Sequence, residues 1–72
     1  MVTISYPKAG RRIEVSLTHA EGLTLKQYCK QVTGLIGVRM RCNVVNPQTR
    51  ERLRLAHVPR DGETIVFELA GR

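Results

Sequence analysis

Five arginine residues recur at alternate positions in two short stretches of the second half of the chain. Clustered guanidinium groups hold phosphates or carboxylates through paired, planar hydrogen bonds, so these side chains are the best candidates for contacting a partner. If both stretches are strands of one antiparallel pair, alternation brings the arginines to one face or edge of a sheet. The predicted contact residues, with one apolar neighbour, are Arg39, Arg41, Arg50, Arg52, Arg54 and Val66.

Three interpretations of this arginine pattern stay open. The charges could protect an exposed edge strand from aggregation, dock onto an acidic protein surface, or contact the phosphates of RNA. Twelve Lys and Arg against six Asp and Glu give a net charge of +6, which favours an acidic partner of either kind. The aromatic residues, Tyr6, Tyr28 and Phe67, all fall on predicted core faces, so no platform is left on which unpaired bases could stack.

The sequence contains no arrangement typical of catalysis or of metal or cofactor binding. Paired carboxylates, a Ser-His-Asp set, a phosphate-binding glycine loop and metal-ligand spacings are all missing. His19 and His57 are expected to be surface or loop histidines, and Cys29 and Cys42 buried free thiols. We therefore expect a protein with no enzymatic activity and no cofactor.

The first half of the chain predicts two strands and a helix. Residues 2–6 and 13–17 alternate apolar and polar side chains, which is typical of half-buried strands, and a basic hairpin link at 7–12 joins them. Thr24 and Gln27 have the spacing of a capping box, so a helix is expected from residue 24 to about residue 33. Its apolar stripe is Leu25, Tyr28, Cys29 and Val32, and Gly34 supplies a left-handed C-terminal cap.

The second half predicts three more strands separated by turns. Residues 39–45 alternate, 46–49 form a turn around Pro47, and 50–55 form a short strand. A turn at 59–62 leads into the last strand. The residues expected to point into the core are Met40, Cys42, Val44, Leu53, Leu55, Ile65, Phe67 and Leu69.

These elements predict one α+β domain, residues 1–72, with the order ββαββ(β). The first and last strands must pair in parallel, and the helix covers one face of the mixed sheet. The opposite face is expected to carry Thr3, Ser5, Glu14, Ser16, Arg39, Arg41, Asn43, Val66 and Glu68, with Arg52 and Arg54 as further candidates. No apolar run approaches the roughly 20 residues of a membrane helix, and the first six residues do not have the pattern of a signal peptide, so we expect a cytoplasmic protein with no membrane partner.

The pattern resembles the β-grasp superfamily, which includes ubiquitin-like proteins, sulfur carriers and TGS domains. The most specific piece is Val58 to Phe67, whose Asp61-Gly62-Glu63 turn is similar to the entry to the last strand in sulfur carriers and TGS domains. Sulfur carriers and conjugating modifiers end in Gly-Gly, whereas this chain ends in Ala70-Gly71-Arg72. The resemblance thus implies a β-grasp fold, and carrier chemistry would require processing of the C-terminus.

Our preferred hypothesis from the sequence is a non-catalytic, ubiquitin-like protein–protein interaction module, an adaptor or small structural subunit. It would dock onto an acidic protein surface through the basic sheet face. The alternatives are a TGS-like module that binds RNA or the ribosome, and a sulfur carrier or modifier. An exposed edge strand would also allow homo-oligomers.

Overall fold

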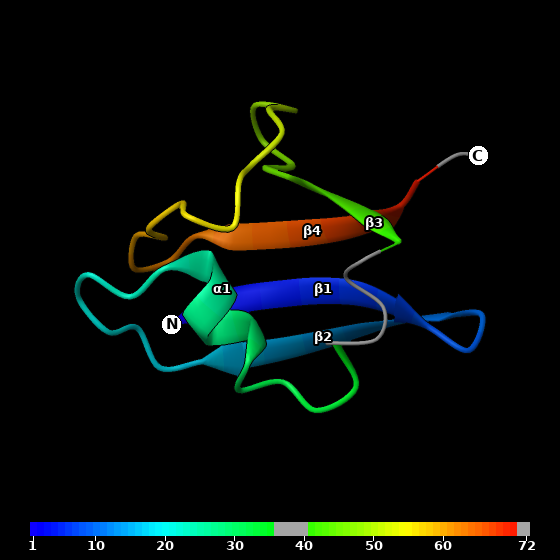
Figure 1. The fold of residues 1–72 in the computed structure, drawn as a ribbon, viewed down its shortest axis with the longest axis horizontal. Coiled ribbons are helices and arrows are strands. Elements are labelled where there is room, and N and C mark those ends of the chain that lie inside the picture. Colours follow the sequence, from blue (N-terminus) through cyan, green and yellow to red (C-terminus); the bar gives the residue numbers. More distant parts are fainter. Residues whose placement is uncertain (36–40, 71–72) are drawn as a thin grey trace.

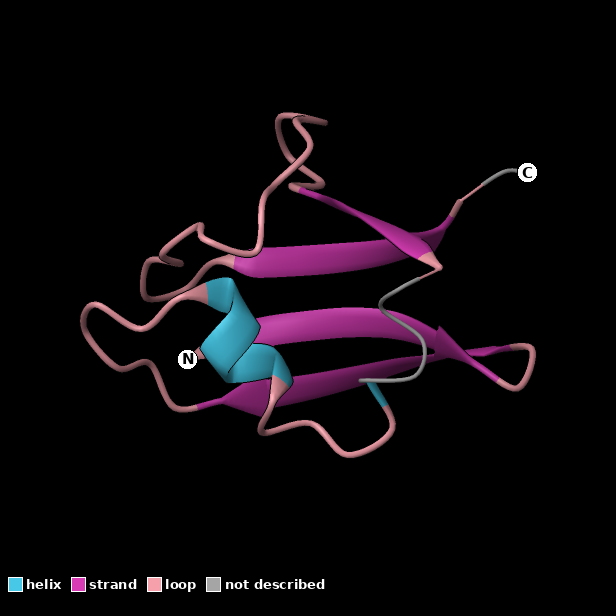
Figure 2. Cartoon of the chain, viewed as in Figure 1, coloured by secondary structure: helices cyan, strands magenta, loops and turns pink. Residues whose placement is uncertain are grey.

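The computed structural model describes residues 1–35 and 41–70, which form an α+β structure with one mixed sheet and one short helix. The elements are β1 (Val2–Lys8), β2 (Arg11–Leu17), α1 (Leu25–Cys29), β3 (Cys42–Val45) and β4 (Thr64–Leu69). The strand order across the sheet is β2-β1-β4-β3, so the strands nearest the two ends of the chain lie in its centre (Figure 1). Helix α1 crosses one face of this sheet (Figure 2).

The central pairing of β1 with β4 is parallel, and this confirms the prediction for the first and last strands. It spans residues Thr3–Ser5 of β1 and Thr64–Val66 of β4. The outer pairs, β1 with β2 and β3 with β4, are antiparallel. A parallel pair cannot be joined by a tight turn, so the chain between these strands crosses the sheet and carries the helix with it.

The hairpin between β1 and β2 is tighter than predicted. The strands continue through Lys8 and Arg11, which leaves Ala9 and Gly10 as a two-residue turn in place of a link at 7–12. Both turn residues have positive φ, 51° and 77°, the handedness that matches the twist of the flanking strands. Pro7 is therefore a strand residue.

The helix begins as predicted and ends earlier. Thr24 caps it, and Thr24 and Gln27 form the complete capping box. After Cys29 the backbone forms turns with shorter hydrogen-bond spacing than an α-helix. The Gln31 N–H donates to the Tyr28 carbonyl at 3.0 Å, and the Val32 N–H donates to the Cys29 carbonyl at 3.1 Å. These bonds span three residues, so the prediction of a helix to residue 33 is wrong, although Val32 stays buried.

The short strand predicted at 50–55 is reduced to an isolated bridge between Val45 and Arg52. The cause lies at the start of α1, whose first N–H groups need acceptors outside the helix. The Leu25 N–H donates to the His57 carbonyl at 2.7 Å, and the Lys26 N–H to the Leu55 carbonyl at 3.0 Å. The loop must leave the sheet to supply these carbonyls.

The core lies between α1 and the sheet, and two predicted core residues fall outside it. Leu55 is 36% exposed because the loop has left the sheet, and Leu69 is 61% exposed because β4 runs on past its pairing with β1. Leu53 and Cys42 are half-buried at the core margin, and Met40 lies outside the described residues. The buried core residues are Val2, Ile4, Tyr6, Leu25, Tyr28, Cys29, Val32, Leu35, Val44, Ile65 and Phe67.

The hydroxyl of Tyr28 ties the loop before α1 to the core, and its removal tests this contact. It accepts from the Ala20 N–H at 2.8 Å and donates to the Ala20 carbonyl at 3.1 Å. Tyr28→Phe should lower the free energy of unfolding by about 1–2 kcal/mol, measured by urea denaturation, because two hydrogen bonds are lost. In the described part of the chain the Tyr6 hydroxyl has no such partner, so Tyr6→Phe is the control, and equal losses in both variants would contradict the assignment.

Candidate binding surfaces

The sheet face opposite α1 has no helix over it, and we call it the uncovered face. Strand alternation and the buried core positions fix which side chains point to it. Val45 of β3 lies directly opposite Val66 of β4, and both are half-buried. The remaining described strand residues predicted for this face do lie there: Thr3, Ser5, Glu14, Ser16, Asn43 and Glu68.

The structure separates the arginines that the sequence pattern grouped. Arg52 pairs with Val45 in the bridge, and its guanidinium donates to Asn43 Oδ1, so it belongs to the uncovered face. Arg50 has a left-handed φ of 65° and lines a hollow that includes both valines and Pro47. Two other predicted arginines do not join them: Arg54 is exposed on the loop, and Arg41 lies before the start of β3. The prediction for Arg39 falls outside the described residues.

The uncovered face is mixed in charge, whereas the sequence predicted a basic face. Glu14 of β2 and Glu68 of β4 both point to it. Arg52 lies at its β3 edge, and Arg12 lies above β1.

Four cationic residues of the described chain surround a hollow of about 490 Å³ at the end of the sheet. It lies where the β1–β2 hairpin and the last residues of β4 separate (Figure 1). Its described lining contains four cationic side chains and the exposed Leu69, with no acidic residue. We call it the basic cleft, and its lining residues are Pro7, Lys8, Ala9, Gly10, Arg11, Arg12, Arg41 and Leu69.

Arg12 is fixed in place between the two central strands. Its Nη1 donates to the hydroxyl of Ser5 at 3.0 Å and to the carbonyl of Phe67 at 3.1 Å. Ser5 is only 3% exposed, so the guanidinium satisfies a buried hydroxyl as well as a backbone acceptor.

Proline explains why that carbonyl is free to accept from a side chain. In the parallel ladder the Thr3 N–H donates to the Glu63 carbonyl at 3.0 Å, and the pattern repeats at every second residue. The repeat places Pro7 opposite the Phe67 carbonyl, and proline has no N–H to donate. The ladder stops at Ser5, and Arg12, which is paired with Pro7 across the hairpin, supplies the missing donor. The sequence signal is the proline that directly follows the alternating residues 2–6, at a position predicted to be in the hairpin link.

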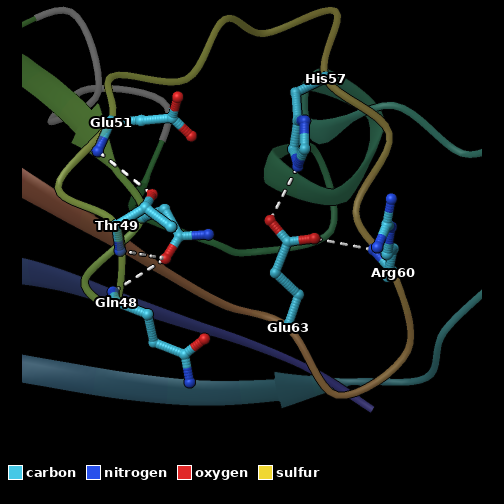
Figure 3. A network of polar contacts seen from close by, with 7 residues as sticks. Gln48, Thr49, Glu51, His57, Arg60 and Glu63 are labelled. Carbon is cyan, nitrogen blue, oxygen red and sulfur yellow. Dashed lines mark hydrogen bonds and ion pairs between the residues drawn. The ribbon is translucent and has the colours of Figure 1, made fainter.

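A second polar cluster organises the loop between β3 and β4 (Figure 3). The Glu63 carboxylate accepts from the Arg60 N–H at 2.8 Å and lies 2.7 Å from His57 Nε2, which confirms His57 as a hydrogen-bonded loop histidine. Asn46 Oδ1 accepts from the N–H groups of Gln48 and Thr49 and holds the predicted turn around Pro47. These contacts shape the loop, and we assign them no binding role.

The cysteines differ in their environment. Cys29 is fully buried, as predicted, whereas Cys42 is only half-buried. Partial burial raises the pKa of the Cys42 thiol above its ordinary value, and the positive charge of Arg12 opposes this rise. Cys42 therefore reports on the position of Arg12.

Comparisons with protein families, curated proteins and solved structures found no match to this chain. Within residues 1–35 and 41–70, no three His, Cys, Asp or Glu side chains are placed to hold a metal ion. No helix in the same residues is long and apolar enough to cross a membrane.

Alkylation of the folded protein by iodoacetamide, followed by mass spectrometry across a pH series, tests the environment of Cys42. Cys42 should react before the buried Cys29, with a midpoint above pH 9.0, because the thiolate is the reactive form. Arg12→Gln should move the midpoint higher still, since it removes the charge that opposes the rise, and Lys30→Gln should leave it unchanged. If Arg12→Gln leaves the midpoint unchanged, the guanidinium of Arg12 does not lie close to Cys42.

Proposed function

We propose that this chain is a β-grasp, ubiquitin-like domain that acts as a non-catalytic protein interaction module. It serves as an adaptor or small structural subunit and docks onto an acidic protein surface through the uncovered face. The alternating strands, the arginine residues beside them and the lack of a catalytic motif in the sequence support this proposal.

Three features of the structure support the β-grasp assignment. The chain order is ββαββ, the first and last strands are parallel neighbours, and one helix packs against a single sheet face. The turn at Asp61-Gly62 leads directly into β4, with the left-handed φ of 88° at Gly62 that such a turn requires. The bridge between Val45 and Arg52 stands where the short strand of the predicted ββαββ(β) order was expected.

The observation that carries the docking proposal is the pairing of Val45 and Val66 beside Arg50 and Arg52. The valines form a small apolar centre on an otherwise polar sheet face, and the two arginines and Glu68 border it. No described Lys or Arg side chain lies within 4.0 Å of a described carboxylate. Arg52 donates to Asn43 through Nη2, and its other N–H groups, like those of Arg50, can pair with acids of a partner. An apolar centre with arginine beside it is typical of protein interfaces.

The same surface is poorly suited to unpaired RNA bases. Tyr6 is 4% exposed, and Tyr28 and Phe67 are fully buried, which confirms that these rings belong to the core. Contact with RNA would then rest on phosphates alone and would weaken steeply with salt. We therefore place protein ahead of RNA and use nuclease to separate them.

Affinity capture with the tagged chain from its native source, after nuclease treatment, tests the proposed function. Arg52→Glu/Val66→Ser should reduce capture of a defined protein about tenfold or more, because it reverses one charge and removes the apolar centre. Lys26→Glu is the matched control, since it makes the same charge change on α1, on the other side of the sheet, and should retain capture.

Two results would count against this docking surface. If nuclease releases everything that is bound, the partner is nucleic acid and the module binds RNA. If a protein is retained equally by Arg52→Glu/Val66→Ser and by wild type, docking does not use the uncovered face. Thermal denaturation followed by circular dichroism should confirm that each variant is folded.

A further inference from the structure

We infer that the basic cleft is a second contact site, and that it binds an acidic peptide segment bearing an apolar side chain. This inference deepens the proposed function and rests on it for the choice of a protein occupant. The cleft lies at the Cys42 end of β3, whereas Val45, at the other end of the strand, borders the docking surface. Arg12 reaches Ser5, which pairs with Val66, so the two surfaces adjoin, and variants of residues that belong to only one of them distinguish the two.

Arg12 gives the cleft a preorganised hydrogen-bond donor. Both of its bonds to the protein, to Ser5 and to Phe67, come from Nη1. The Nε–Nη2 edge of the same guanidinium remains available, and this edge offers two parallel donors that match the two oxygens of a carboxylate. Because the side chain is already held, less conformational entropy is lost when an acid binds than for a free surface arginine.

The rest of the cleft fits an acidic occupant. Arg11 and Arg41 add positive charge at its rim, and Lys8 extends along the helix side until its Nζ lies near Gly34. No acidic side chain in the described lining offsets these charges. Like charges gathered without a counterion destabilise the free protein, and an acidic ligand relieves this repulsion.

Leu69 favours a peptide over a nucleic acid as that occupant. It is 61% exposed and forms an apolar wall of the cleft, beside Pro7 and Ala9. A phosphodiester backbone gains nothing from such a wall, whereas a peptide places carboxylates and an apolar side chain within a few residues of each other. The buried aromatic rings remove the stacking contacts that would favour RNA.

Pro7 allows the cleft to be altered without changing its charge. In Pro7→Ala the new N–H can donate to the Phe67 carbonyl and extend the ladder of β1 with β4 by one bond. Arg12 would then share the Phe67 carbonyl with a backbone donor and keep only Ser5 as an acceptor of its own, so its position would be less fixed. The variant should keep the fold and weaken the site.

The experiment measures fluorescence anisotropy of a short, labelled synthetic peptide of alternating glutamate and leucine, at fixed ionic strength. Wild type should bind it, and Arg12→Gln and Pro7→Ala should each weaken binding about tenfold, equivalent to one strong charge-assisted interaction. Lys30→Gln removes the same charge as Arg12→Gln away from the cleft and should bind as wild type. Circular dichroism confirms the fold of each variant.

The inference is overturned if the peptide does not bind, or if Pro7→Ala binds as tightly as wild type. It is also overturned if a duplex RNA or a vesicle of anionic phospholipid binds more tightly than the peptide with the same dependence on Pro7. Peptide binding that is lost in Pro7→Ala supports the cleft even where the affinity capture finds no protein partner. If Pro7→Ala still captures the protein partner and wild type does not bind the peptide, the proposal of docking through the uncovered face stands and the inference about the cleft is wrong.

Discussion

The parallel pairing of β1 with β4 is the contact on which the rest of this structure depends. It covers only Thr3–Ser5 and Thr64–Val66, yet it joins the two ends of the described chain and puts Ile4 beside Ile65 at the centre of the core. The apolar side chains of α1 are buried against the sheet, and the sheet is continuous only because this pairing joins its two hairpins. Because the paired residues are about sixty positions apart in sequence, the loop-closure cost is met before the core contacts form, so we expect folding to be slow for a chain of this size.

The limit of that pairing creates the most distinctive feature of the surface. Pro7 cannot donate to the Phe67 carbonyl, and Arg12 takes over as donor because the two-residue turn pairs it with Pro7. Pro7 thus ends the ladder between β1 and β4 and leaves a carbonyl that holds the Arg12 guanidinium. Stability and binding are therefore linked: a longer ladder between β1 and β4 would stabilise the sheet but would bring together the strands that form the cleft.

Local sequence patterns were sufficient to predict the strands near the two ends of the chain and the start of the helix. Alternation and the capping box depend only on neighbouring residues. They failed at residues 50–55, where arginine and leucine alternate as in a strand. There the N–H groups of Leu25 and Lys26 take carbonyls from the loop, and no local pattern reports a hydrogen bond to a distant helix. The candidate site changed for the same reason: Arg52 alone keeps a strand partner, and the role of Arg12 depends on a hairpin register that the sequence left unresolved.

The two surfaces lie at opposite ends of β3, which is four residues long, or about 10 Å of strand. They adjoin at β1, because Arg12 of the cleft donates to Ser5, which pairs with Val66. A typical interface buries about 800 Å² on each partner, so one partner can cover both surfaces at once. Between them Asn43 and Glu68 face each other on the uncovered side. A uniformly acidic partner would meet repulsion at Glu68, whereas a partner with acids at both ends and a neutral or basic residue between them would not. The position of this carboxylate thus makes the surface selective among acidic proteins, a property that net charge alone cannot provide.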